Sequence, residues 1–296
     1  MTRSKRQNII SLGWLLPILA YFLLFSLPPI YMLFYYSFTD LRYIAGTESW
    51  CGFQNYIDIF TIPKFLEAFG TTFLMAIFLM VFGLITGFGV ALMLRTLGKG
   101  KVFFRTLWYI PVLLAMPVIA KLLSYMLWTD GFLNQAIKSF GGEPVDFYAS
   151  TFWMYFWIVF LVVWKNIGSS AILFLAAFGG ISPEIYEAAK IDGASRTRML
   201  FSITLPLIRP VMGFVIINGA IGALGTFEPV QLISHGDPNR TTVTILYEIY
   251  NQAFMNREQG FASALSVVVF IVTLLVTILN MRFTDSSLLT GKERDA

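Results

Sequence analysis

The residues best suited to chemistry lie inside long apolar stretches. Lys165 stands near the middle of residues 147–183, which carry no other charge. A lysine at the centre of a bilayer costs about 2.5–3.5 kcal/mol on insertion scales, so its ammonium should face a protein interior or water. Asn166 and Ser169 lie on the same part of a helix, because positions three and four apart are neighbours on its surface. This polar stripe favours a pathway for a polar solute.

A second group of small and polar residues lies further along the chain. It comprises Asn218, Gly219, Ala223, Thr226, Glu228 and Gln231. Its glycines have a simpler explanation, because small residues let membrane helices pack closely. The chain has one histidine, His235, and one cysteine, Cys51, so the sequence offers no catalytic set, no metal site and no internal disulfide.

Composition places these residues in a membrane. The chain is 57% hydrophobic and 13% charged, whereas soluble domains carry about 25% charged residues. The net charge of +4 is spread over short loops, which argues against nucleic-acid binding. Lipid is therefore expected to surround an all-α, polytopic bundle that forms a single domain, residues 1–296. Six segments are long enough to cross about 30 Å of hydrocarbon, and they are 7–39, 68–94, 107–128, 152–178, 207–233 and 259–281.

The loops between these segments alternate in charge. Those on one side hold 14 of the 21 lysines and arginines, and those on the other side hold five. Because cytoplasmic loops carry the excess of basic residues, both termini are predicted to be cytoplasmic, as a short segment 1–9 and a tail 283–296. Pro111 and Pro117 predict a kink in the third helix, because proline cannot donate a backbone hydrogen bond.

The cytoplasmic loop 179–206 contains strong helix signals. Ser182 suits an N-cap and Pro183 the first helical position, while Gly193 can end the helix in a left-handed conformation. Ser195 can cap a second short helix, residues 196–204, which Pro206 should stop. These signals predict two short helices that project into the cytoplasm. Capping alone explains an ordinary surface hairpin and a docking site equally well.

The same loop carries the most specific motif in the chain. The motif consists of Glu187-Ala188-Ala189, two further residues and Asp192-Gly193-Ala194, with Leu205-Pro206 further on. This pattern resembles the EAA motif of binding-protein-dependent ABC importer permeases. Shorter runs at 52–56, 236–238 and 260–264 resemble segments of maltose-type sugar permeases. The resemblance implies that the loop seats in a cleft of a separate ATPase. Glu187 and Gly193 would be central to that docking, and Ala188, Ala189, Asp192 and Ala194 would support it.

The resemblance also implies a function and partners. It indicates a permease subunit of an ATP-driven importer for a sugar or oligosaccharide, in the cytoplasmic (inner) membrane of a bacterium or archaeon. The implied partners are a second, homologous permease in a heterodimer, two ATP-binding subunits and an extracytoplasmic solute-binding protein. The chain has no G-x-x-x-x-G-K-[ST] loop, so ATP and Mg²⁺ are expected on the ATPase, and this chain is expected to bind no cofactor and to catalyse no reaction.

Two other classes of protein fit fewer of these features. A secondary transporter or channel would use Lys165 and Glu228 inside the membrane and would need no ATPase. Its support is weaker, because the chain shows no inverted repeat of broken helices. A membrane-embedded enzyme would need a convergent acid, base or metal cluster, which His235 alone cannot supply.

Overall fold

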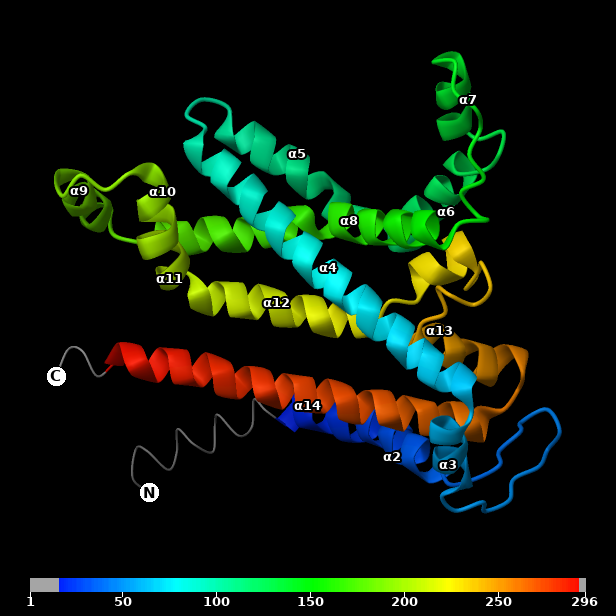
Figure 1. The fold of residues 1–296 in the computed structure, drawn as a ribbon. Coiled ribbons are helices and arrows are strands. Elements are labelled where there is room, and N and C mark those ends of the chain that lie inside the picture. The colour runs from blue at the N-terminus through cyan, green and yellow to red at the C-terminus, as the bar shows by residue number, and fades with distance from the viewer. Residues whose placement is uncertain (1–15, 293–296) are drawn as a thin grey trace, which may run out of the picture. The chain divides into compact units, whose positions relative to one another are not determined.

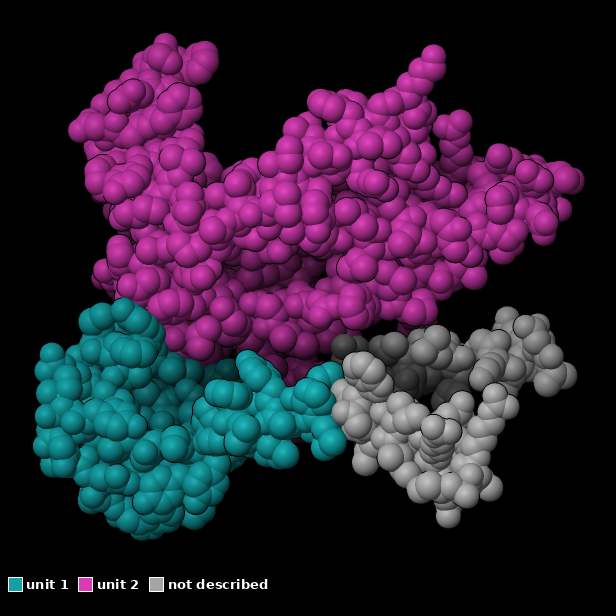
Figure 2. Space-filling view, turned by 180° about the vertical axis from the view of Figure 1, so that it is seen from behind, with its two compact units in different colours: residues 1–65, 249–270 teal, residues 66–248, 271–296 magenta. Residues whose placement is uncertain are grey.

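The computed structural model describes residues 16–292, with side chains described up to residue 279. The predicted cytoplasmic segment 1–9 and the last four residues of the tail lie outside the described residues. Within 16–292 the chain is built from helices and turns, with two isolated β-bridges in place of any strand. It divides into two compact units, residues 1–65 with 249–270 and residues 66–248 with 271–296 (Figure 2).

The described helices confirm the all-α membrane architecture. Four of them are each long and apolar enough to span a bilayer, namely Leu16–Tyr36, α4 (Pro63–Thr96), α8 (Thr151–Gly179) and the Gln259–Leu279 part of α14 (Gln259–Lys292). Two bent pairs also pass this test, α5 (Lys101–Leu113) with α6 (Met116–Met126) and Arg196–Leu207 with α12 (Arg209–Leu224). By length and composition, the described residues therefore hold four candidate spans, or up to six if each bent pair is one span.

The kink predicted in the third segment is a complete break. Helices α5 and α6 meet at an angle of 90°. Leu114 and Ala115 between them are extended, with ψ values of 139° and 130°. Pro117 lies in the first turn of α6, where its missing N–H has no intrahelical partner to lose. The break leaves the last carbonyl groups of α5 without helical partners.

In the first unit, the chain folds back between α2 (Leu27–Tyr36) and α3 (Gln54–Thr61). Asn55 Nδ2 donates to the carbonyl oxygens of Ser37 and Thr39, both at 3.0 Å. The N–H of Gly260, in the first turn of α14, donates to Leu41 O at 3.0 Å, and a Cβ there would collide with Thr39 O. Two runs that resemble sugar permeases, 52–56 and 260–264, therefore hold this turn closed.

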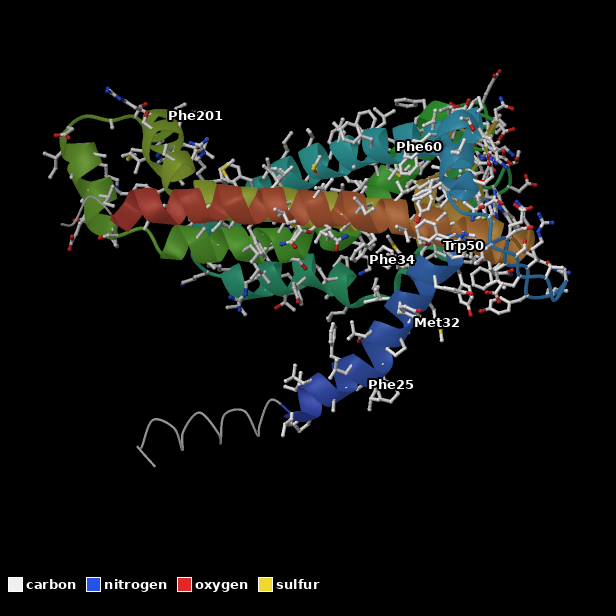
Figure 3. All side chains as sticks on the ribbon, turned by 90° about the horizontal axis from the view of Figure 1, so that it is seen from below. Phe25, Met32, Phe34, Trp50, Phe60 and Phe201 are labelled. Atoms are coloured by element: carbon white, nitrogen blue, oxygen red, sulfur yellow. The ribbon has the colours of Figure 1, made fainter. Side chains whose placement is uncertain are left out.

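Helix α2 and the π-helical turn before it, η1 (Phe22–Ser26), present an apolar outer surface. Phe25 and Met32 are 65% and 50% exposed, and both side chains project outward from the helix (Figure 3). An exposed apolar helix of this length suits contact with lipid rather than water.

The second unit holds the larger core. Its buried residues include Leu94 of α4, Phe174 and Phe178 of α8, and Ile208 before α12. Helix α8 packs on α5 so closely that a Cβ on Gly168 would collide with the backbone of Trp108 and lie 2.8 Å from Tyr109 Cα. The helices α9 (Pro183–Ile191) and α10 (Arg196–Met199) extend beyond one end of this unit, and α7 (Phe132–Ser139) lies at the other (Figure 1).

Replacing Gly168 with alanine should therefore destabilise the second unit. The new methyl group meets backbone atoms, which cannot rotate away, and overpacking of this kind costs about 1–3 kcal/mol. Gly213→Ala in α12 is the matched control, because its Cβ would meet no atom within 4 Å. We expect a lower midpoint of thermal unfolding in detergent for Gly168→Ala and an unchanged or higher one for Gly213→Ala. Equal midpoints would contradict the close contact.

Candidate functional site

Helix α9 begins as its sequence predicts. The Ser182 side chain accepts a hydrogen bond from the Glu184 N–H at 3.4 Å, and Pro183 occupies the first helical position. Glu184 lies in the first turn, where a negative charge complements the positive end of the helix dipole. A helix of nine residues is marginal in water by itself, so this cap and the contacts to its neighbours must hold it.

The end of α9 is a Schellman motif. Gly193 has φ +74°, the left-handed conformation that glycine adopts without a steric penalty. Its N–H donates to Lys190 O at 3.0 Å, and the N–H of Ala194 donates to Ala189 O at 2.9 Å. These two bonds satisfy carbonyl groups that would otherwise be left free and turn the chain sharply after Asp192. The role predicted for glycine at the end of this helix is confirmed.

The second short helix starts as predicted but does not stop at Pro206. The Ser195 hydroxyl accepts from Arg198 N–H at 3.2 Å, which caps α10. The chain then continues through a π-helical turn, η2 (Leu200–Thr204), and α11 (Leu205–Leu207), and bends by 68° at Ile208. The prediction that Pro206 ends the helix was wrong. The wide turn of η2 precedes Pro206, which lies in the first turn of α11, where proline is tolerated.

The residues of the predicted docking motif divide between two sides of α9. Glu187, Ala188 and Asp192 are exposed, whereas Ala189 is buried against the rest of the unit. Ala194 is half-buried in the turn that follows. The small side chain of Ala189 thus serves the contact of α9 with its own chain. Ala188 lies on the open side.

Sequence reasoning missed a residue on this open side. Ile191 is 86% exposed at the end of α9. It lies three and four residues after Ala188 and Glu187, so the three share one helical face. We name Glu184, Glu187, Ala188 and Ile191 the outer face of α9. Ile191 is thus a strongly exposed apolar residue at the C-terminal end of an otherwise acidic, open face, and the helical spacing of position 191 could have revealed it.

A cavity of about 360 Å³ lies among the membrane helices of the second unit. Five of the residues predicted for the solute pathway line it, together with an α4 wall that includes Met80 and Gly83. The five are Asn166 and Ser169 of α8 and Asn218, Gly219 and Ala223 of α12. The volume and the few polar groups among apolar walls are typical of a small-molecule site. The α4 wall was not predicted, because glycines in a membrane helix are equally expected from close helix packing.

Lys165 does not line this cavity. Its Nζ donates to Val112 O at 3.1 Å, at the end of α5. That carbonyl is one of those left free by the break before α6, and a cation there also complements the negative end of the helix dipole. The structure therefore gives Lys165 a role in holding the broken third segment against α8.

Three other predicted pathway residues also lie away from the cavity. Helix α12 ends at Leu224, so the part of the predicted segment after Gly225 is not a continuation of it. Thr226 is buried and its carbonyl accepts from Thr244 Oγ1 at 2.8 Å. Glu228 is exposed, and Gln231 lies in the π-helical turn η3 (Val230–Ser234). Pro229 lacks an N–H, which explains why the helix cannot run on through these residues.

Comparisons with known proteins agree with this geometry. Residues 83–286 match the family model described as the binding-protein-dependent transport system inner membrane component. The diacetylchitobiose uptake system permease protein NgcF of Streptomyces coelicolor is 33% identical over 87% of this chain and 77% of its own length. The sn-glycerol-3-phosphate transport system permease protein UgpA of Escherichia coli is 30% identical over 85% of this chain and 86% of its own.

The fold also matches a solved structure. A bacterial ABC transporter involved in the import of the acidic polysaccharide alginate has a chain that is 25% identical to this one. The two superpose with a TM-score of 0.81, over 95% of this chain and 98% of that chain. The match therefore covers both the membrane helices and the loop that carries α9.

Proposed function

The chain belongs to the family of binding-protein-dependent transport system inner membrane components, and from this membership we propose how it works. It is a permease subunit of an ABC importer, and the outer face of α9 is where a separate ATPase docks. ATP-driven closure of that ATPase moves α9 and opens the cavity between α4, α8 and α12 to alternate sides of the membrane. The ATP and Mg²⁺ belong to the ATPase, and this chain only transmits the motion.

The observation that carries this proposal is the outer face of α9. A capped helix with a defined end leaves Glu187 and Ala188 exposed to solvent, and Ile191 is 86% exposed at its end. Ile191 contributes nothing to the core of its own subunit, so any burial of its side chain would have to come from a partner. The outer face fits a cleft in a partner protein that holds an apolar side chain with carboxylates around it.

The solute is proposed to be a sugar or oligosaccharide. The relatives named for diacetylchitobiose and sn-glycerol-3-phosphate support a hydroxyl-rich solute. Asn166, Ser169 and Asn218 line the cavity and provide amide and hydroxyl groups that can exchange hydrogen bonds with sugar hydroxyls. A cavity of about 360 Å³ holds a small solute, so a longer sugar would need space contributed by a second permease subunit.

The arrangement proposed in the membrane follows the charge pattern. Each bent helix pair counts as one span, which gives six spans in one transmembrane domain with both termini in the cytoplasm. The partners are a homologous permease in a heterodimer, two ATP-binding subunits and an extracytoplasmic solute-binding protein. The membrane is the cytoplasmic membrane of a bacterium.

A secondary transporter that uses Lys165 and Glu228 is less well supported by the side-chain geometry. Lys165 is bound to the end of α5, and Glu228 is exposed beyond the end of α12. The two proposals differ in a simple measurement. The chain reconstituted alone should take up no solute in response to an ion gradient, and uptake under those conditions would favour the secondary transporter.

The end of α9 gives the direct test of docking. Gly193→Val forces a β-branched residue into a left-handed conformation, which costs about 1–2 kcal/mol, so the helix end should be displaced. We expect the amount of ATPase subunit that copurifies to fall about tenfold, since 1.4 kcal/mol corresponds to a factor of ten.

The matched control for this test is Gly193→Asn, because asparagine tolerates the left-handed conformation. A side chain at position 193 meets no atom within 4 Å in the free subunit, so any loss with valine arises from the backbone. We expect the asparagine variant to keep most of the copurifying ATPase. If the valine variant retains as much as the native chain, the proposed role of this loop is wrong.

A further inference from the structure

Tyr186 joins the inner side of α9 to the membrane helices of the second unit by hydrogen bonds. Tyr186 is half-buried on the side of the helix opposite the outer face. Its hydroxyl lies 3.2 Å from Arg95 Nη1, in the last turn of α4, and 3.0 Å from Thr204 Oγ1, in the segment that leads to α12. One tyrosine therefore contacts α4 and the segment that continues into α12, two of the three helices that wall the cavity.

The donors and acceptors in this group have a single consistent order. A guanidinium can only donate, so the Tyr186 oxygen accepts from Arg95. The Tyr186 proton is then directed to Thr204 Oγ1, and the Thr204 hydroxyl donates to Met199 O at 3.3 Å. Each hydroxyl gives one hydrogen bond and receives one. Thr204 is only 2% exposed, so displacement of Tyr186 would leave its hydroxyl oxygen buried without a donor.

Aromatic contacts strengthen the same connection. The Arg95 guanidinium carbon lies 4.6 Å from the centre of the Tyr186 ring and 5.2 Å from the centre of the Phe178 ring. Both distances are within the range of cation–π attraction. Phe178 is buried in the core of the second unit at the end of α8. Arg95 is thus held between the projecting helix and the core.

We infer that Arg95, Tyr186 and Thr204 form the link that transmits displacement of α9 to α4 and α12. This inference rests on the proposed function, because it assumes that an ATPase moves α9. The three residues are positioning residues, since none of them lies on the outer face or lines the cavity. With the link intact, a displacement of α9 also displaces α4 and α12. Without the link, the ATPase can displace α9 while α4 and α12 keep their positions.

The link can be tested without knowing the solute. Cys51→Ser removes the one native thiol, and Asn218→Cys places a new thiol in the cavity. The readout is the rate at which a maleimide labels this cysteine in the full importer complex, with ATP and vanadate and without nucleotide. With the native link we expect the two labelling rates to differ. We define the labelling ratio as the faster rate divided by the slower one. Tyr186→Phe, which keeps the ring and removes the hydroxyl, should reduce this ratio about fivefold.

Further variants separate transmission from folding and docking. Thr204→Val should reduce the ratio as Tyr186→Phe does, and the double variant should lose no more than either single one, because both interrupt the same link. Thr197→Val, at an exposed position of α10, is the matched control and should behave as the native chain. Copurification of the ATPase should stay within about twofold of native in all of them.

The outcomes that overturn the inference are distinct from those that overturn the proposed function. An unchanged labelling ratio in both Tyr186→Phe and Thr204→Val would show that the link does not transmit motion. Loss of ATPase from these variants would assign the hydroxyl group to docking or folding instead. Failure of the native chain to bind an ATPase, or to change its labelling with ATP, would overturn the proposed function itself.

Discussion

Ile191→Asp is expected to lower the affinity of this chain for its ATPase about a hundredfold or more. In the free subunit Ile191 is 86% exposed, so the substitution removes no packing, and the added negative charge at the C-terminal end of α9 should cost the chain no more than about 1 kcal/mol. On docking, the isoleucine would be buried, which is worth about 1.5–3 kcal/mol. The aspartate would forgo that gain and would also bring an unpaired carboxylate out of water, beside the carboxylates already on the outer face.

The measurement is equilibrium binding of the purified ATPase to the chain in lipid nanodiscs. Ile191→Ala should give an intermediate loss of about tenfold, because it removes apolar area without adding charge. Phe140→Asp is the matched control. Phe140 is 92% exposed just after α7, at the end of the second unit away from α9 (Figure 1). If Ile191→Asp binds the ATPase as well as Phe140→Asp does, α9 does not dock through its outer face.

A second apolar residue allows this surface to be mapped further. Phe201 follows α10 and is 62% exposed, with its side chain directed away from the helices (Figure 3). It lies in the same projecting loop as the outer face of α9 but on a different helical turn. A docking site limited to α9 should tolerate changes at Phe201, and a broader one should not.

Local signals made the projecting helix predictable. A serine, a proline and an acidic residue at its start, and a glycine at its end, act through the backbone within a few residues. The structure places each of them as expected. The end of the second short helix was predicted less well, because a wide π-helical turn before Pro206 changes what the proline does, and nothing in a single sequence reports such a turn.

The cavity was predicted only in part, and for a different reason. The polar residues of α8 and α12 could be found from their rarity in apolar segments. Whether such a residue faces a cavity depends on partners far along the chain, such as Val112 for Lys165, 53 residues away. The link through Tyr186 could not be predicted for the same reason, because Arg95 is 91 residues from Tyr186 along the chain. Helix periodicity carries no information on contacts of that kind.

Gly222→Trp should reduce uptake about a hundredfold while the ATPase still docks. Gly222 lines the cavity, and a Cβ there would meet no atom within 4 Å, so the backbone can accept a side chain. An indole ring would then occupy a large part of about 360 Å³ and leave too little space for a sugar. Removing a glycine from a helix interior also favours the helix by up to about 1 kcal/mol, so misfolding is not expected.

Gly213→Trp is the matched control for this experiment. Gly213 lies in the same helix, a Cβ on it would also meet no atom within 4 Å, and it does not line the cavity. Both variants add the same apolar ring to α12, so they should insert into the membrane and bind the ATPase equally. Uptake of the labelled sugar bound by the cognate binding protein should be lost only in Gly222→Trp. Equal uptake by the two variants would place the solute pathway outside this cavity. It would also contradict the proposed roles of Asn166, Ser169 and Asn218.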